Sequence, residues 1–232
     1  LHPDVLPEFA QDNTGDNISD WNPRYSELTG LYWLWKNCDS PYKGLVHYRR
    51  HFARPGFFEL HLPRDRFQRI ATQDDVLPLV EQYGILLPKK RKYYIETIYS
   101  HYAHTFPIEQ LDLTRRIIMN HSSEYIPAFD KVMSSNCAHM FNMFVMEKNK
   151  VNEYCSWLFP VLKALENEID SSGYDSFNKR FPGRISEMLL DVWLYGCGYN
   201  FVEFPVVSSE MTNWFVKGTS FLCARFFHTK YS

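Results

Sequence analysis

The chain has 232 residues, enough for one large domain, or at most two small ones, with a substantial buried core. Its 27 acidic and 25 basic side chains nearly cancel, so the net charge of −2 argues against a nucleic-acid-binding protein. Aromatic residues make up 17% of the chain, which fits sugar stacking but is also ordinary core material.

The cysteines indicate a reducing compartment. There are five of them, an odd number without close pairs, which argues against a disulfide framework or a zinc site: Cys38, Cys137, Cys155, Cys197 and Cys223. No apolar stretch reaches the length of about 18 residues that spans a membrane, and no leader peptide is recognisable. The chain opens at Leu1 without a methionine, so we expect the start of the protein to be missing. The expected location is the cytoplasm, with the inner face of the plasma membrane as the narrower alternative.

The first part of the chain predicts a loop, a helix and two strands. Residues 1–22 are loop-like, and Asn22-Pro23 is typical of a helix start, with a capping residue before a proline. That helix ends near Asn37 and has one apolar face: Leu28, Leu31, Tyr32 and Trp35. Apolar runs bounded by turn residues predict strands over 43–48 and 83–87.

The second part continues the alternation. Helices are predicted over 95–104, 108–120 and 151–169 and from Gly183 onward, and strands over 140–146 and 199–207. Strands that alternate with helices predict the α/β class with a Rossmann-like, mostly parallel central sheet flanked by helices. We find no repeat or linker, so one domain over residues 1–232 is expected.

The run Gly44–Arg50 turns from apolar to polar at the end of a predicted buried strand. Ligands of open α/β sheets bind beyond the carboxyl ends of the strands, and the guanidinium fork matches phosphate oxygens. Strand alternation would put Tyr48 and Arg50 on one side and His47 and Arg49 on the other. A solvated surface cluster is the alternative. Since arginine is rarely buried without an anionic partner, these residues predict an anion site.

Glu187 is the candidate general base. Gly183 permits a tight helix entry, Arg184 can supply a cation, and Glu187 would lie in the first turn, where the helix dipole keeps a carboxylate ionised. Asp191 follows one turn later on the same face and is the reserve base. The structural alternative is a first-turn glutamate that only stabilises the helix.

Two further segments carry polar groups. The loop over residues 12–16 favours turns, yet Asp16 and Asn17 could bind sugar or ribose hydroxyls. The basic run over residues 89–92 is too short for a nucleic-acid site, which leaves a solvated flank of the next helix or a phosphate contact from one lysine, such as Lys89.

His101 and His104 lie three residues apart on a predicted helix, a spacing that can hold a metal, but no third ligand is evident nearby. His139 and Asn142 begin an apolar strand. A buried asparagine must be hydrogen-bonded or line a site, and the sequence leaves both open.

An ordered set of motifs resembles a bacterial family encoded in capsular and exopolysaccharide gene clusters and formerly catalogued as a domain of unknown function. The motifs run from about Asp12 to Phe226: GDNIS, ELTGLYWLWKN, GLVHYRR, ILLPKK with YYIETIYSHY, AHMFNMFVM, EYCSWLFPVL, GRISE and NWFVKGTSF. The family is regarded as glycosyltransferases with a GT-A-like fold, some linked to galactofuranose transfer. Members typically begin with a strand of the type IFVATHK, which this chain lacks.

The resemblance implies transfer of a sugar from a nucleotide-diphosphate sugar, with a UDP-sugar and in particular UDP-galactofuranose as the best guess, to a hydroxyl of a growing surface glycan. GT-A enzymes usually carry an Asp-x-Asp metal motif where this chain has His47-Tyr48-Arg49. We therefore expect fixed cations to replace a divalent metal and no bound cofactor. The donor side would comprise His47, Tyr48, Arg49, Arg50, Lys89, Asp16, Asn17 and Arg184. The acceptor side would comprise His101, His104, His139 and Asn142.

The catalytic step would be an inverting displacement with Glu187 as base and Asp191 in reserve. The expected partners are the nucleotide sugar and a lipid-linked glycan acceptor, which would allow peripheral membrane association. Two alternatives stay open: a non-catalytic carbohydrate-binding subunit of an assembly complex, and a glycosidase or phosphodiesterase. No two acids pair convincingly across strand ends as a glycosidase requires.

Overall fold

The computed structural model describes residues 9–54 and 67–209. The NWFVKGTSF motif and Cys223 lie outside the described residues. The helices are α1 Asn22–Tyr25, α2 Leu28–Asn37, α3 Gln73–Tyr83, α4 Ile98–Thr105, α5 Glu109–His121, α6 Ile126–Ser134, α7 Lys148–Glu168 and α8 Phe181–Cys197. The strands are β1 Tyr42–Leu45, β2 Arg50–Phe52, β3 Ile85–Pro88, β4 Arg91–Lys92, β5 Cys137–Ala138, β6 Phe144–Glu147, β7 Val202–Phe204 and β8 Val206–Ser208.

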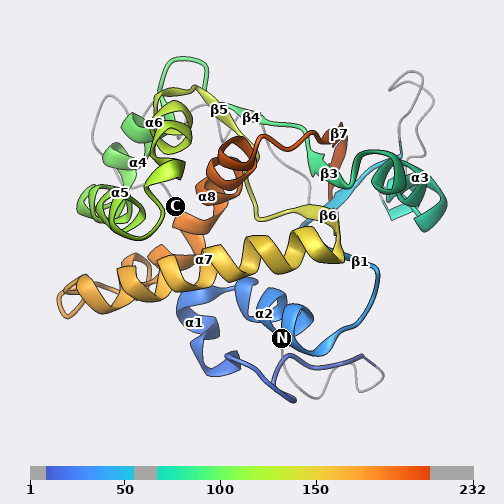
Figure 1. Cartoon of the computed structure of the whole chain (residues 1–232), viewed down its shortest axis with the longest axis horizontal. Helices are drawn as coiled ribbons and strands as arrows, with labels where there is room; N and C mark the ends of the chain where they lie inside the picture. Colours follow the sequence, from blue (N-terminus) through green and yellow to red (C-terminus); the bar gives the residue numbers. More distant parts are fainter. Residues whose placement is uncertain (1–8, 55–66, 210–232) are drawn as a thin grey trace.

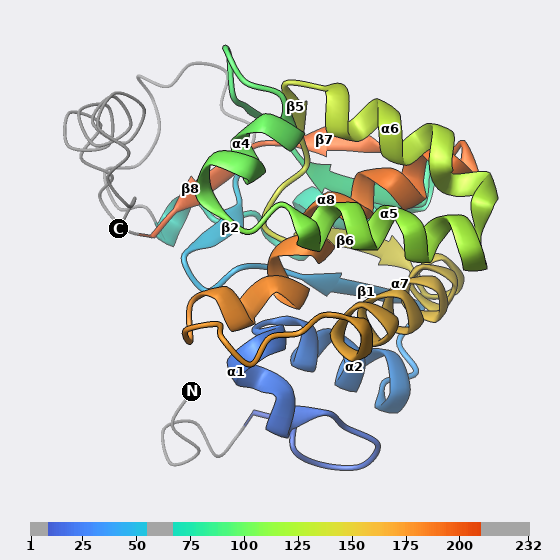
Figure 2. The same cartoon turned by 90° about the vertical axis from the view of Figure 1, so that its left-hand side faces the viewer.

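The central sheet has the strand order β1-β6-β3-β7. The predicted α/β class, with a sheet flanked by helices, is confirmed, and the sheet is mixed. Among the described strands, β3 and β7 run parallel, whereas β6 is antiparallel to both β1 and β3. The β1 strand is therefore an antiparallel edge strand rather than a buried parallel one. Figure 2 shows the strands stacked from β7 to β1, with α1 and α2 beyond the β1 edge.

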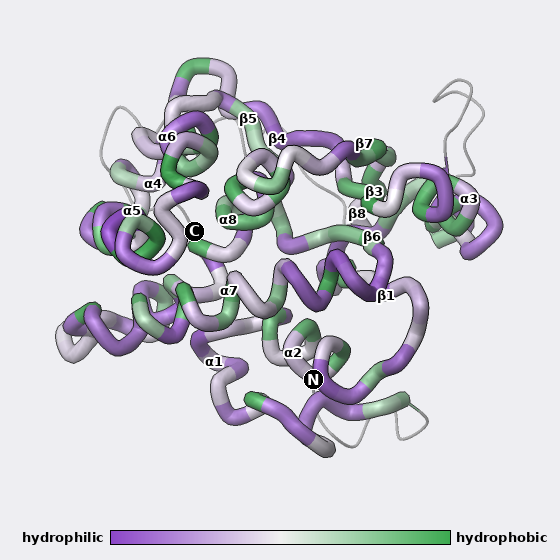
Figure 3. Tube along the Cα trace, in the orientation of Figure 1, coloured by the Kyte–Doolittle hydropathy of each residue, from purple (hydrophilic) through white to green (hydrophobic). Residues whose placement is uncertain are grey.

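The sheet buries both faces because side chains along a strand alternate. In β3, Ile85 and Leu87 join the main core, whereas Leu86 joins a smaller core with Val80 of α3. Helices α7 and α8 pack on one face of the sheet and α3 packs on the other, as Figure 1 shows. The short strand β4 consists of two exposed basic residues and is purple, that is hydrophilic, in Figure 3. The strand predicted at 83–87 is confirmed as β3, but it begins two residues later, because Tyr83 ends α3 and Gly84 caps that helix.

Helix α8 supplies the centre of the main core with Leu189, Val192 and Trp193. It begins at Phe181, with Pro182 in its first turn, earlier than the predicted start at Gly183. Glu187 thus lies nearly two turns inside the helix, beyond the reach of the helix dipole. The expected first-turn position of Glu187 is wrong, and its ionisation has to be explained by its neighbours.

Two predicted strands are shorter than expected. The 140–146 run is a strand only from Phe144 onward, because Phe141 and Asn142 adopt left-handed backbone with φ of +79° and +52°. The 199–207 run divides into β7 and β8 around Pro205, since a proline has no N–H for a sheet ladder. The helix predicted from Asn22-Pro23 to near Asn37 is interrupted at Ser26, where φ is +53°, and forms α1 and α2. The predicted helices over 108–120 and 151–169 are confirmed within one to three residues at their ends as α5 and α7.

Candidate functional site

The segment His47–Arg50 is a tight turn that leads from β1 into β2, not the end of one strand. Arg50 N–H donates to the carbonyl of His47 at 3.0 Å, and Arg49 N–H donates to His47 Nδ1 at 3.2 Å. Tyr48 at the tip is 72% exposed. The predicted strand alternation of these side chains is wrong, because the chain reverses here.

Aromatic rings hold both arginines of the turn. The Arg49 guanidinium lies 4.6 Å from the ring centre of Tyr48, and that of Arg50 lies 3.9 Å from the ring centre of Phe141. Burial lowers the pKa of Arg50, and the neighbouring charges of Arg49 and Arg91 lower it further. Arginine stays protonated in proteins, so the turn presents a dense positive charge in a fixed orientation.

Glu187 faces this turn. The Phe141 N–H donates to Glu187 Oε2 at 3.0 Å, and the Arg50 guanidinium lies over the ring of the same Phe141. Burial raises the pKa of Glu187 to about 7, and the negative charge of Glu27 acts in the same direction. The Phe141 N–H and the cations Arg91 and Arg50 act in the opposite direction. A carboxylate with a pKa near 7 is suited to take up and release a proton at neutral pH.

The left-handed pair Phe141–Asn142 is fixed by two side chains and one backbone carbonyl from other parts of the chain. Asn142 Nδ2 donates to Glu27 Oε1 at 2.7 Å and to the Gly183 carbonyl at 3.3 Å, and Ser186 Oγ donates to Asn142 Oδ1 at 3.0 Å. Asn142 is thus a satisfied buried amide in a turn, not a strand residue. These bonds aim the Phe141 N–H at Glu187.

Asp191 lies one turn after Glu187 and contacts the same 139–142 segment, but it serves His139. Its carboxylate oxygens accept from the His139 backbone N–H at 3.0 Å and pair with His139 Nδ1. The other ring nitrogen, Nε2, lies 3.0 Å from Glu203 Oε1. His139 and Asp191 are fully buried, so they lie beneath the candidate site and not on its exposed surface.

Replacing Asp191 by Asn is expected to destabilise the fold by about 3–5 kcal/mol, because it removes a buried carboxylate that binds both the backbone N–H and the Nδ1 of His139. Urea unfolding with an unchanged m value would measure this loss. The control is Asp130→Asn, which removes an exposed ion pair with Arg115 and should cost about 1 kcal/mol or less. Equal effects of the two substitutions would contradict the assignment.

The other predicted donor residues lie in different surroundings. Tyr32 Oη donates to Asp16 Oδ1 at 3.2 Å, and Asn17 Nδ2 donates to the Gly15 carbonyl at 2.9 Å, so both belong to a loop tied to α2. Arg184 donates to the carbonyls of Phe177 and Asn178 at 2.6 and 3.0 Å. Lys89 is exposed directly after β3. Nothing in these contacts connects them with the turn at His47–Arg50.

His101 and His104 share one carboxylate. Each Nδ1 lies 2.9 Å from a different oxygen of Glu96. Within residues 9–54 and 67–209, no group of three or more His, Cys, Asp or Glu side chains is placed to hold a metal ion. The ring of His101 also packs on that of Tyr93, with 4.4 Å between the ring centres. The Arg91 guanidinium lies 4.9 Å from the ring centre of Tyr93.

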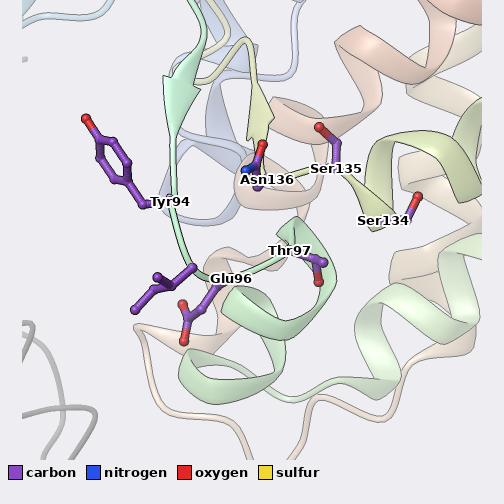
Figure 4. Close-up of a pocket in the computed structure, with 7 residues that line it drawn as sticks. Tyr94, Glu96, Thr97, Ser134, Ser135 and Asn136 are labelled. Carbon is purple, nitrogen blue, oxygen red and sulfur yellow. The ribbon is translucent and has the colours of Figure 1, made fainter.

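Glu96 also lines a shallow cavity of about 430 Å³, shown in Figure 4. The remaining lining residues are Tyr94, Ile95, Thr97, Ser134, Ser135 and Asn136. Tyr94 is 80% exposed, has left-handed backbone with φ of +58°, and points away from the ribbon in Figure 4. Exposed aromatic, amide and hydroxyl groups thus occur together beside the two histidines.

Sequence reasoning missed Glu27, Arg91 and Phe141. Glu27 opens the ELTGLYWLWKN motif and Arg91 lies in the basic run 89–92, so both were visible as residue types. Their convergence on Glu187 depends on the fold.

Among the helices of the described residues, none is long and apolar enough to span a membrane.

Comparisons with known proteins agree with this architecture. A family model described as "Domain of unknown function (DUF4422)" matches residues 1–197. No curated protein matches the chain. Among solved structures, the apo structure of the bifunctional glycosyltransferase WbbM superposes with a TM-score of 0.77 and 30% identity, over 87% of this chain and 39% of that chain. This chain therefore spans well under half the length of WbbM.

The likeness confirms the predicted GT-A-like α/β fold class, since it covers most of the described residues at a high TM-score. The family match covers the candidate site from Glu27 to Asp191. The chain belongs to the DUF4422 family, a family named as a domain of unknown function.

Proposed function

We propose that this chain is a glycosyltransferase that moves a sugar from a nucleotide-diphosphate sugar to a hydroxyl group of a growing glycan. One observation carries the proposal: Glu187, with a pKa of about 7, faces the fixed cations Arg50 and Arg91. The likeness to a bifunctional glycosyltransferase supports it. A base beside a cationic anchor is what transfer away from a diphosphate requires.

In the proposed step, the acceptor oxygen forms a bond to the anomeric carbon while the bond from that carbon to the diphosphate oxygen breaks. The acceptor proton moves to Glu187. The negative charge that develops on the diphosphate is stabilised by Arg50 and Arg49, whose guanidinium groups are already held by aromatic rings. His47 lies beside Arg50, since its Nδ1 is 3.4 Å from an Arg50 nitrogen. Attack opposite the leaving group inverts the anomeric centre.

The donor in this proposal is a UDP-sugar, with UDP-galactofuranose as the first to test, and the cations of the turn take the place of a divalent metal. The acceptor is a lipid-linked glycan of a capsular or exopolysaccharide type, reached from the cytoplasmic side of the membrane. The cavity beside Tyr94 and Glu96, next to His101 and His104, suits such an acceptor because aromatic rings stack on sugars and amides bind their hydroxyls.

Thermal unfolding in the presence of UDP, GDP, CMP and their sugars tests the donor. At a hundredfold excess over its dissociation constant, a bound nucleotide stabilises the fold by about 2.7 kcal/mol, which is roughly 5–10 °C for a chain of this size. We expect this shift for UDP and UDP-sugars, followed by UDP release when an acceptor glycan is added. Shifts with free glycans alone, and none with nucleotides, would instead indicate a carbohydrate-binding subunit.

A further inference from the structure

Glu27 belongs to the candidate site but has no part in the proposed reaction. It lies directly before α2, half-buried, while Glu187 comes from α8 on the far side of the 141–142 turn. Two carboxylates from distant parts of the chain are thus brought to one two-residue turn. Like charges brought together at a partly buried site are unfavourable unless something requires them there.

The turn binds both carboxylates at once through adjacent residues. The Asn142 side chain donates to Glu27 at 2.7 Å, and the Phe141 backbone N–H donates to Glu187 at 3.0 Å. Both residues have positive φ, which costs free energy in residues other than glycine and persists only where the surroundings enforce it. Ser186, the neighbour of Glu187 on α8, completes the link by donating to Asn142.

We propose that Glu27 and Glu187 form a coupled carboxylate pair held by the Phe141–Asn142 turn, in which Glu27 is a positioning residue that controls how readily Glu187 takes up a proton. The role of Glu187 as the base rests on the proposed function, whereas the coupling itself does not. Burial would still favour the protonated form without Glu27, but the charge that opposes Arg50 and Arg91 would be lost, so Glu187 would ionise more readily and would be a weaker base.

The charged groups around Glu187 allow this assignment. Arg50 from β2 and Arg91 from β4 favour its ionised form, and Glu27 is the acidic neighbour that opposes them. Tyr93 and Arg184 also interact with it electrostatically. Among these groups of the described chain, Glu27 has the sign needed to keep a proton on Glu187.

The test is an NMR titration of protein labelled with carbon-13 at the glutamate carboxyl carbons, with Glu27 and Glu187 assigned from the signals lost in Glu27→Gln and Glu187→Gln. Glutamine at position 27 keeps the oxygen that accepts from Asn142 and removes only the charge. We expect the Glu187 midpoint to fall by roughly one pH unit, a tenfold loss of proton affinity. Glu153→Gln, on the exposed face of α7, is the matched control and should leave the midpoint in place.

A second measurement follows the Glu27 signal itself. In the unaltered protein, coupled groups report on each other, so the Glu27 signal should inflect at the midpoint of Glu187, and Glu187→Gln should remove that inflection. A Glu187 midpoint that moves by less than about 0.3 pH units in Glu27→Gln, or a Glu27 curve without the inflection, would overturn the coupling. Neither measurement uses a substrate, so loss of the proposed transferase activity and loss of the coupling are separate outcomes.

Discussion

Glu187→Gln is expected to lower the turnover of the UDP-sugar by a factor of about 10²–10⁴, the usual contribution of a general base. The glutamine side chain has the same shape and can still accept from the Phe141 N–H, so the turn at 141–142 should persist. What the variant loses is the ability to take the acceptor proton. Release of UDP with and without acceptor measures the effect, and a circular dichroism spectrum and melting temperature check the fold.

The pH profile provides the internal control. Glu187 acts as a base only when ionised, and its pKa is about 7, so kcat/KM should rise with pH up to about that value and level off above it. In Glu187→Gln the residual activity should lose this acidic limb. Asp191→Asn should keep the limb at its original pH even though the protein is less stable, because Asp191 contacts His139 and not the reacting groups. Near-normal turnover of a folded Glu187→Gln protein would contradict the base assignment.

The sequence pattern named side chains that the fold brings near one another, but it did not give their geometry. Both GLVHYRR and GRISE supplied residues that meet in the fold, His47, Arg50 and Glu187 among them. The spacing of Glu187 and Asp191 correctly placed them on one face, since both contact the 139–142 segment. Periodicity is a local property, and it suffices for helices such as α2 and α7 that bury one apolar face.

The turn at Phe141–Asn142 could not be predicted because tertiary contacts specify it. An apolar run that contains Phe141 and Asn142 is typical of a strand, and only the hydrogen bonds to Glu27, Gly183 and Ser186 hold it in left-handed backbone. The turn at His47–Arg50 was missed although its closing bond is local: the His47 carbonyl accepts from the Arg50 N–H inside a segment whose composition suggests a continuous strand. Such local conflicts with sequence preference are expected at functional sites.

Arg50→Gln is expected to lower kcat by a factor of about 10²–10³, the cost of removing one preorganised group that stabilises the departing charge. Arg50 combines three interactions within the candidate site. Its guanidinium lies over Phe141 and beside His47, and its charge acts on Glu187. UDP affinity should also weaken. Arg50→Lys keeps the charge but not the planar fork, so its activity should lie between those of Arg50→Gln and the unaltered protein.

The control for this substitution is Arg54→Gln, shortly after the same strand, which removes an exposed arginine paired with Asp75 and should leave turnover within about a factor of two. The pH profile separates a direct role from a general loss of structure. Because Arg50 lowers the pKa of Glu187, its removal should move the acidic limb of the profile toward higher pH, the opposite of the shift expected for Glu27→Gln. Unchanged kcat and an unshifted limb in a folded Arg50→Gln protein would show that the diphosphate is held elsewhere.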